Sequence, residues 1–185
     1  MDHFYHDIGG FFFFEGAYKK FVQEAADNSH FVEVGAYKGR STAFMAVEII
    51  NSGKKIKFDV VDHWMGSSEH NDDVDVQNKT LYDAFIKNLE PVSGHFTPIR
   101  KDSVDAAEEY ANNSLDLVFI DASHDYDSVN EDIKAWLPKV KPGGYIAGDD
   151  YSFGDVRRAV LNNFDEAKVE SIGGYPSWVY KKESE

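Results

Sequence analysis

The chain has 185 residues, of which 42% are hydrophobic and 15% aromatic, enough apolar material for one compact domain with a full core. Its 19 basic and 33 acidic residues give a formal net charge of −14. Such a field repels phosphate backbones and anionic membranes, which argues against nucleic acid and membranes as partners and favours a small molecule. Solubility alone is the other explanation for this acidity.

The sequence contains no cysteine, which excludes disulfides, thiolate metal sites and a cysteine nucleophile. The first residues carry no basic segment, and the apolar run at residues 11–14 is too short for a signal core or a membrane span. We therefore expect a cytoplasmic protein.

An N-terminal segment precedes the main domain. Residues 11–14 read FFFF, and a helix is predicted at residues 15–26. We interpret the aromatic run as a stripe that covers the core, since it would otherwise expose a large apolar patch. A flap near the functional site and a homodimer contact are the alternatives. The predicted division is residues 1–29 for this segment and 30–182 for the main domain.

Apolar, β-branched runs then alternate with segments of helical period. Strands are predicted at residues 31–34, 57–61, 95–99, 115–120 and 144–147, and helices at 42–50, 81–89, 104–110, 129–137 and 156–164. Because the strands are too apolar to have a solvated face, they predict a parallel sheet with helices on both sides. Right-handed crossovers place the loops that follow the strands at one edge, where ligands bind in such sheets.

Two stretches depart from this alternation. Residues 63–78, HWMGSSEHNDDVDVQN, form an unusually long connection, which we interpret as a substrate or lid loop, with a solvated insertion as the alternative. At the C-terminus, short β-type runs at residues 166–172 and 178–181 are joined through Gly173, Gly174, Tyr175 and Pro176, and they predict a hairpin.

The segment 31–42, FVEVGAYKGRST, runs from a strand through a glycine-containing turn into a helix. Gly35 and Gly39 let the backbone turn tightly and approach a ligand. The amides at the start of the next helix can meet a carboxylate or a phosphate. Tyr37 stands where a dinucleotide-binding loop has its second glycine, which argues against a dinucleotide.

Acidic residues follow the other strands. Asp62 can accept hydrogen bonds from both hydroxyls of a ribose, with a turn cap as the alternative. Asp121 follows the fourth strand, and Asp149 and Asp150 follow the fifth. Neighbouring parallel strands lie about 4.8 Å apart, so these carboxylates can converge, and they remain ionised together only near a positive charge. A hard divalent cation, most of all Mg²⁺, meets this need, and helix capping is the alternative for the aspartate pair.

Further polar residues lie close to these strand ends. His124 comes three residues after Asp121, and its ordinary pKa near 6.5 suits a general base; a surface histidine is the alternative. Asp102 and Ser103 follow the third strand, where either can cap a helix or contact a ligand. Trp64 and Tyr151 are candidates for a pocket wall or for packing.

The motif EVGAYKGRS resembles the first motif of class I S-adenosylmethionine-dependent methyltransferases, and GAYxGxS resembles the catechol-type, metal-dependent O-methyltransferases. The motif IDASHDYDSVNED is more similar to the branch that acts on macrolide sugars and small natural products, since His124 stands where the catechol type has lysine. The resemblance implies an α/β, single-domain Rossmann-like methyltransferase fold. Its mostly parallel seven-stranded sheet would end in a C-terminal antiparallel hairpin strand, with helices on both faces.

The resemblance also implies the site residues. Tyr37 and Ser41 would lie near the methionine carboxylate of the cofactor, and Asp102 or Ser103 near its adenine. The full set of predicted cofactor-binding residues is Glu33, Gly35, Ala36, Tyr37, Gly39, Ser41, Asp62, His63, Asp102, Ser103 and Asp121. The predicted metal ligands are Asp121, Asp149 and Asp150, and the predicted catalytic residues are His124 and Asp121.

The function implied is transfer of the methyl group of S-adenosylmethionine to a hydroxyl of a small acceptor, a sugar or a secondary metabolite, assisted by Mg²⁺. The metal would lower the pKa of the hydroxyl while His124 takes its proton. Two alternatives stay open: a non-catalytic cofactor-binding interaction protein, and a metal-dependent nucleotide-sugar enzyme, against which the lack of a phosphate loop argues.

Overall fold

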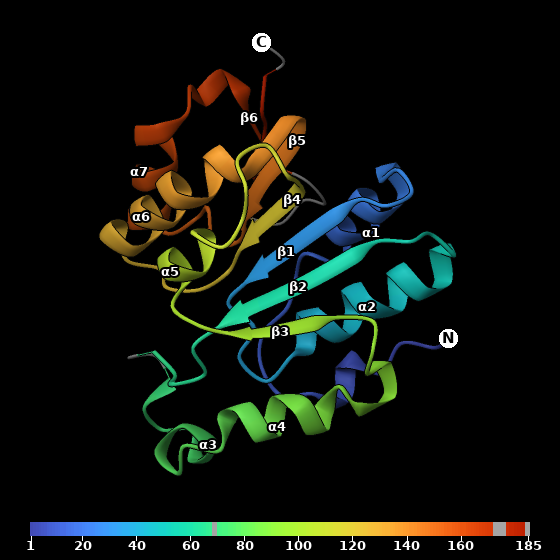
Figure 1. Ribbon diagram of the computed structural model, residues 1–185. Coiled ribbons are helices and arrows are strands. Elements are labelled where there is room, and N and C mark those ends of the chain that lie inside the picture. The colour runs from blue at the N-terminus through green and yellow to red at the C-terminus, as the bar shows by residue number, and fades with distance from the viewer. Residues whose placement is uncertain (68–69, 172–176, 184–185) are drawn as a thin grey trace.

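The computed structural model describes residues 1–67, 70–171 and 177–183. Its centre is a twisted sheet in the strand order β3-β2-β1-β4-β5-β7-β6 (Figure 1). The strands are β1 (His30–Val34), β2 (Lys57–Asp62), β3 (Thr97–Arg100), β4 (Leu115–Ile120), β5 (Val140–Gly148), β6 (Val169–Glu170) and β7 (Trp178–Lys181). The first five strands are parallel, and β7 runs antiparallel to β5 and β6. This is the fold class that the sequence predicts.

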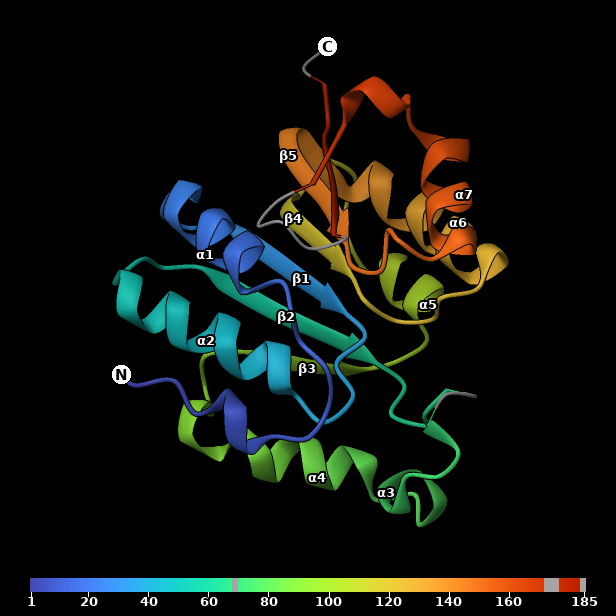
Figure 2. The same ribbon diagram turned by 180° about the vertical axis from the view of Figure 1, so that it is seen from behind.

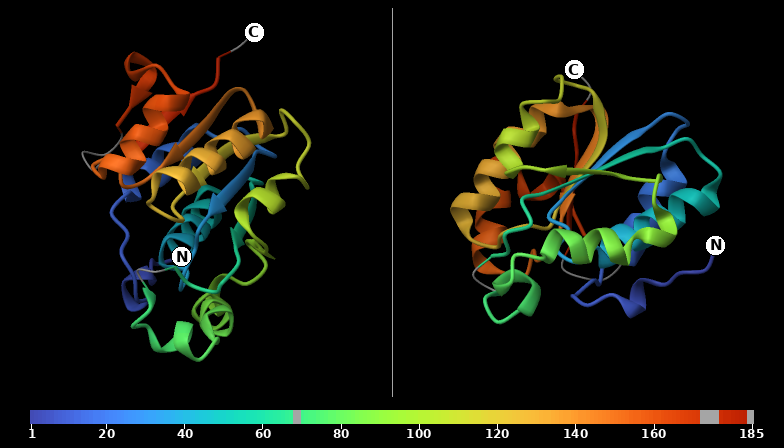
Figure 3. Two further views of the ribbon diagram at one scale, coloured as in Figure 1. Left: turned by 90° about the vertical axis from the view of Figure 1, so that its left-hand side faces the viewer. Right: turned by 60° about the horizontal axis from the view of Figure 1, so that its bottom comes forward.

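Helices cover both faces of the sheet, as the two opposite views and the two tilted views show (Figures 2 and 3). One face carries α1 (Glu15–Glu24), α2 (Arg40–Ser52), α4 (Leu81–Asn88) and the N-terminal segment; the other carries α5 (Ser103–Ala107), α6 (Tyr126–Trp136) and α7 (Gly154–Asn163). The short α3 (Val74–Gln77) lies at the start of α4. Single 3₁₀ turns are η1 (Tyr5–Asp7), η3 (Glu90–Val92), η4 (Leu137–Lys139) and η5 (Glu166–Lys168).

The alternation of side chains along each strand builds two cores. On β1, Phe31 contributes to the core beneath α1 and α2, while Val32 and Val34 contribute to the core beneath α6 and α7. Successive side chains of a strand point to opposite faces, so both faces of these apolar strands are buried. This double burial explains why the sequence shows continuous apolar runs rather than an alternating pattern.

The aromatic run at residues 11–14 divides between two environments. Phe12 and Phe14 are 3% and 1% exposed and belong to the core around α1 and α2, as predicted. Phe11 and Phe13 are 88% and 48% exposed. The interpretation of the whole run as a core stripe is therefore wrong for two of its four members, because alternate side chains of the run point away from the core.

The C-terminal hairpin is present but shorter than predicted. Residues 166–168 form η5 rather than a strand, and β6 contains only Val169–Glu170, in which Val169 pairs with Tyr180 of β7. The predicted joint at residues 173–176, together with residue 172 before it, lies outside the described residues. Within the described ranges, no helix combines the length and the apolar character needed to cross a bilayer.

Candidate functional site

The sheet register brings the predicted site residues to one edge. Val34 of β1 pairs with Val61 of β2 and with Ile120 of β4, and Ile120 pairs with Gly148 of β5. The residues that follow these positions, Gly35, Asp62, Asp121 and Asp149, therefore stand in one row at the carboxyl ends of four parallel strands.

Gly35 makes the tightest contact in this row. Its φ is +86°, and a Cβ built on it would lie 2.1 Å from the carbonyl oxygen of Asp121. The loop after β1 thus packs directly on the backbone after β4, which only glycine permits. Gly39 has φ +89°, but its missing side chain faces Phe85 and Leu89. Gly39 therefore serves the packing of α4 at the start of α2.

Asp62 organises the glycine loop. One carboxylate oxygen, Oδ2, accepts hydrogen bonds from the backbone amides of Ala36 at 2.9 Å and Tyr37 at 3.0 Å. The other, Oδ1, accepts one from the amide of Trp64 at 2.6 Å. Asp62 thus caps these turns, and it also lines the main cleft. Trp64 itself is 2% exposed and packs in the core.

The main cleft, about 550 Å³, lies between the glycine loop and the segment after β2. Its lining includes Gly35, Ala36, Tyr37, Asp62, His63, Ser103 and Asp121 of the predicted cofactor-binding set. Gly66, Ser67 and His70 of the 63–78 segment line it as well. Seven of the eleven predicted positions thus surround one cavity.

The remaining predicted positions lie elsewhere. Glu33 is 1% exposed and accepts hydrogen bonds from Tyr18 Oη at 2.8 Å and Thr42 Oγ1 at 2.5 Å. It stands on the α1 side of β1, beneath the loop rather than along the cleft. Burial raises the pKa of Glu33 to about 7, against the lowering effect of hydrogen bonds from Ser41, Thr42 and Tyr18.

A smaller cavity adjoins the glycine loop on the N-terminal side. This side hollow, about 300 Å³, is lined by Gly9, Gly10, Phe11, Gly35, Ala36, Tyr37, Arg40, Ser41 and Asp121. Ser41 is the second residue of α2, so this hollow lies at a helix N-terminus, where an anionic group is favoured. Asp121 lines both the main cleft and the side hollow, so it stands where they meet.

Arg40 was not among the residues predicted from the sequence. Its Nη1 donates hydrogen bonds to the backbone carbonyls of Ile8 at 3.2 Å and Gly10 at 2.9 Å, which ties the N-terminal segment to the side hollow. Its buried Nε has no hydrogen-bond partner within the described part of the chain. The signal in the sequence was a cation directly after Gly39, at the start of a helix.

For Asp102 and Ser103 the sequence left two roles open, capping a helix and contacting a ligand, and the structure distinguishes the two residues. Asp102 is the N-cap of α5 and accepts a hydrogen bond from the amide of Val104 at 3.2 Å; it does not line the main cleft. Ser103 does line it, and its Oγ accepts a hydrogen bond from Trp136 Nε1 at 2.9 Å. Burial raises the pKa of Asp132, which is hydrogen-bonded to Ser103, to about 6.

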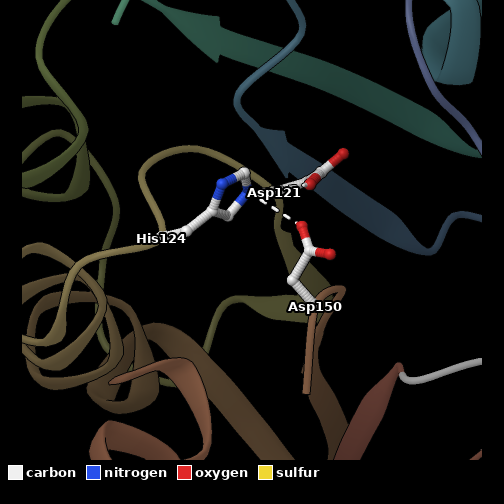
Figure 4. A group of neighbouring side chains, drawn as sticks. All are labelled: Asp121, His124 and Asp150. Atoms are coloured by element: carbon white, nitrogen blue, oxygen red, sulfur yellow. Dashed lines mark ion pairs between the residues drawn. The ribbon is translucent and has the colours of Figure 1, made fainter. Parts of the chain in front are cut away.

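Asp121, His124 and Asp150 form a cluster at the ends of β4 and β5. One ligand atom from each lies within 4.8 Å of the others, and Figure 4 shows the His124 ring facing Asp150, with Asp121 beside them. His124 Nε2 is 2.9 Å from Asp150 Oδ2 and 3.9 Å from Asp121 Oδ1. The sequence predicted both aspartates as metal ligands and the histidine beside them, and folding brings these three together.

Asp149 is next to this cluster but not part of it. It lines a smaller cavity with Asp121, His124 and Trp178, and its buried Oδ1 has no hydrogen-bond partner among the described residues. Burial, followed by the negative charge of Asp121, raises the pKa of Asp149 to about 7. Neither Asp149 nor Asp150 caps α7, whose N-cap is Phe153 without a side-chain bond, so the capping interpretation is wrong.

These observations fit a hard divalent cation. The cluster offers two carboxyl groups and one imidazole, and beside it the orphaned Asp149 oxygen lacks the partner that a buried polar atom needs. Oxygen-rich sites of this kind suit Mg²⁺ or a similar ion. Asp121, Asp149 and Asp150 are the residues that could hold it.

The described part of the 63–78 segment docks against the glycine loop. Asp73 accepts a hydrogen bond from Tyr37 Oη at 2.5 Å and pairs with Lys38 Nζ at 2.7 Å, and Lys38 also pairs with Asp75 at 2.8 Å. The ring of His70 stacks on Tyr37, with centroids 4.2 Å apart. Burial alone would raise the pKa of Asp73. The hydrogen bonds from Lys38 and Tyr37 outweigh this effect and lower the pKa to about 2.

Known structures share this fold. NovP, an O-methyltransferase, superposes with a TM-score of 0.69 and 16% identity over 92% of this chain and 79% of NovP. An S-adenosylmethionine-dependent O-methyltransferase from Thermotoga maritima gives 0.64 and 12%, over 92% of this chain and 65% of that one. CalS11, a TDP-rhamnose 3′-O-methyltransferase of calicheamicin biosynthesis, gives 0.60 and 13%, over 90% and 76%. At these identities the similarity shows the fold.

None of the curated proteins compared by sequence matches this chain. A family model described as a methyltransferase domain matches residues 32–151, from β1 to the residue after Asp150. The matched range contains the glycine loop, Asp62, the main cleft and the Asp121 cluster. The chain therefore belongs to the methyltransferase domain family.

Proposed function

We propose that the protein transfers the methyl group of S-adenosylmethionine to a hydroxyl of a small acceptor. The observation that carries this proposal is the position of Asp121, which lines both the main cleft and the side hollow and also belongs to the cluster with His124 and Asp150. A cofactor in the cleft and an acceptor at the cluster would thus meet at one residue. Family membership and the fold of known O-methyltransferases support the proposal.

The cleft offers each part of the cofactor a fitting neighbour. Asp62 stands at the end of β2, where a carboxylate can bind ribose hydroxyls, and its Oδ1 has the greater remaining capacity because Oδ2 already accepts two amides. Ser103 lies on the wall toward α5, where the adenine is expected. The side hollow holds Ser41 and the Arg40 guanidinium, which suit the methionine carboxylate.

The chemistry follows from the charges at the cluster. A neutral hydroxyl is a weak nucleophile, and His124 is placed to take its proton as the oxygen attacks the methyl carbon. Asp150, 2.9 Å from His124 Nε2, orients the imidazole and stabilises its charged form. Asp121, Asp149 and Asp150 would hold Mg²⁺, which when bound lowers the pKa of the acceptor hydroxyl and neutralises the carboxylates. Holding donor and acceptor in line supplies much of the remaining acceleration.

The rest of the proposal concerns partners. The acceptor is a small molecule, a sugar or a secondary metabolite, and neither nucleic acid nor a membrane is part of the reaction. The net charge of −14 supports this choice. We further propose a cytoplasmic location, with a homodimer as the alternative to a monomer.

The metal role is tested by titrating Mg²⁺ into the protein saturated with S-adenosylhomocysteine, measured by calorimetry. Asp121→Asn removes one charge from the cluster, so we expect Mg²⁺ to bind at least about tenfold more weakly, since hard cations prefer ionised carboxylates. Asp127→Asn, at an exposed position in the first turn of α6, is the matched control and should bind Mg²⁺ like the wild type. Equal Mg²⁺ affinity in Asp121→Asn and the wild type, or no binding in either, would remove the metal from the mechanism.

A further inference from the structure

Two exposed phenyl groups flank the cluster where the acceptor hydroxyl is expected. Phe11 lines the side hollow together with Asp121. Phe153 meets the ring of His124 edge to face, with centroids 5.6 Å apart and an interplanar angle of 88°. The two side chains come from distant parts of the chain, the N-terminal segment and the loop before α7, and both adjoin residues of the same cluster.

Both phenyl groups are largely open to solvent. Phe11 is 88% exposed and Phe153 is 48% exposed, whereas Phe12 and Phe14 of the same aromatic run are almost fully buried. In the described ranges, the one ring stacked on Phe11 is that of Phe13, at a centroid distance of 6.3 Å. A phenyl side chain left in water forgoes the favourable free energy of burial. Here that unburied surface borders the reactive cluster, so a bound acceptor can cover it.

The N-terminal segment holds Phe11 at this place by a defined contact. Arg40 Nη1 donates to the carbonyls of Ile8 and Gly10, the latter directly before Phe11. Gly10 has φ +118°, and a Cβ built on it would lie 3.3 Å from the ring of Tyr37. The backbone therefore passes close to the glycine loop and leaves the Phe11 side chain at the rim of the side hollow.

The charges near the cluster select against an anionic acceptor. Asp121, Asp149 and Asp150 gather there, and three ionised carboxylates carry one negative charge more than a divalent cation bound among them neutralises. In the proposed function the charge of Arg40 meets the cofactor carboxylate, and Lys101, which lines the main cleft, pairs with Glu109. A diphosphate would therefore meet a net negative charge, which raises the cost of binding it.

We propose that Phe11 and Phe153 determine acceptor specificity, by contacting an aromatic ring of an uncharged acceptor whose hydroxyl faces His124. This inference rests on the proposed function. In the reaction the hydroxyl oxygen forms the new bond to the methyl carbon as the sulfur–methyl bond breaks. The electron pair of the broken bond stays on sulfur, and the hydroxyl proton passes to His124. Offset or edge-to-face ring contacts contribute beyond area burial, so they favour an aromatic ring over a saturated one.

The test compares benzyl alcohol with cyclohexylmethanol, whose hydroxyls are alike and whose rings differ in aromaticity. NMR titration of the protein saturated with S-adenosylhomocysteine measures the two dissociation constants, and methyl α-rhamnopyranoside is the sugar probe. We expect benzyl alcohol to bind about three- to tenfold more tightly than cyclohexylmethanol, and the rhamnoside to bind more weakly than both. Phe11→Ala and Phe153→Ala should each reduce this preference to about twofold or less.

Ile86→Ala, an exposed apolar position on α4 away from both cavities, is the control and should keep the wild-type preference. Calorimetry with S-adenosylhomocysteine is performed first on every variant. No binding of this ligand by the folded wild type would refute the proposed function. If this ligand binds normally, the specificity proposal alone would be overturned by equal affinities for the two alcohols, by no binding of either, or by tighter binding of the rhamnoside. An unchanged preference in either phenylalanine variant would overturn it as well.

Discussion

Gly35 and Gly39, the two glycines of the motif GAYKGRS, have different structural roles. Gly35 brings the loop after β1 against the carbonyl of Asp121, whereas Gly39 gives α4 room to pack on the start of α2. Both have positive φ, so the sequence correctly indicates a tight turn at each position. Which element packs against each glycine is determined by the tertiary structure, so the motif alone does not predict it.

Gly35→Ala should disrupt the site. A Cβ at 2.1 Å from backbone cannot be relieved by a side-chain movement, so we expect a loss of about 3 kcal/mol or more in the free energy of unfolding. Gly53→Ala is the matched control, because Gly53 also has a left-handed φ, +68°, but has no atom within 4 Å of the added Cβ. It should lose only about 1–2 kcal/mol. Chemical denaturation measures both, and equal losses would contradict the close approach at Gly35.

The site residues could be predicted where the chemistry is tied to a strand end. Asp62, Asp121 and Asp150 stand where the apolar runs stop, and the register of a parallel sheet brings such positions together. Arg40 and Phe11 could not be assigned in this way. Their roles depend on the path of the N-terminal segment over the glycine loop, and no local pattern encodes a contact across so much sequence.

At the scale of elements, the segment between β2 and α4 lines one side of the main cleft. Its described residues include Gly66, Ser67 and His70 along the cleft, and α3 follows with Asp73 as its N-cap. Asp73 contacts both Tyr37 and Lys38 of the glycine loop. The two walls of the cleft are thus bonded to each other, and cofactor binding at the loop is expected to hold the segment in place.

Tyr37→Phe should loosen this segment. The variant keeps the ring that stacks on His70 but removes the hydroxyl that donates to Asp73, a hydrogen bond to a charged group worth about 1.5–3 kcal/mol. We expect amide hydrogen exchange at residues 70–78 to accelerate about tenfold or more, with little change in β1 or β4. Asp72→Asn, an exposed neighbour, should leave the exchange rates unchanged. Wild-type exchange in Tyr37→Phe would show that the segment is held by other contacts.

Elements with strong apolar periodicity were located well from the sequence, and irregular ones were not. β4 has the predicted bounds, and α2 extends the predicted helix by two residues at each end, to Arg40–Ser52. β5 begins at Val140, earlier than predicted, because Val140 pairs with Leu115 of β4 and the turn-forming KPGG stretch lies in the register shift before the next pair, Leu117 with Tyr145. η5 replaces half of a predicted strand, since three residues carry too little pattern to separate a 3₁₀ turn from an extended run.

At the scale of the whole molecule, the two cores on opposite faces hold the sheet in place. The register of the sheet then sets the row of site residues. A C-terminal antiparallel strand in a mostly parallel seven-stranded sheet was expected from the resemblance to methyltransferases, and the antiparallel β7 beside β5 agrees with it. The net charge of −14 does not prevent acidic groups from gathering at the site, where Asp121, Asp149 and Asp150 are held in close proximity. Such a gathering costs stability, which is typical of functional sites.

The most direct test of the account is calorimetric titration of the folded protein with S-adenosylhomocysteine, comparing the wild type with Asp62→Ala. The account predicts one binding site per chain in the wild type and at least about tenfold weaker binding in the variant, because Asp62 both lines the main cleft and holds the amides of Ala36 and Tyr37. No heat of binding from the folded wild type, or equal affinity in the two proteins, would contradict it.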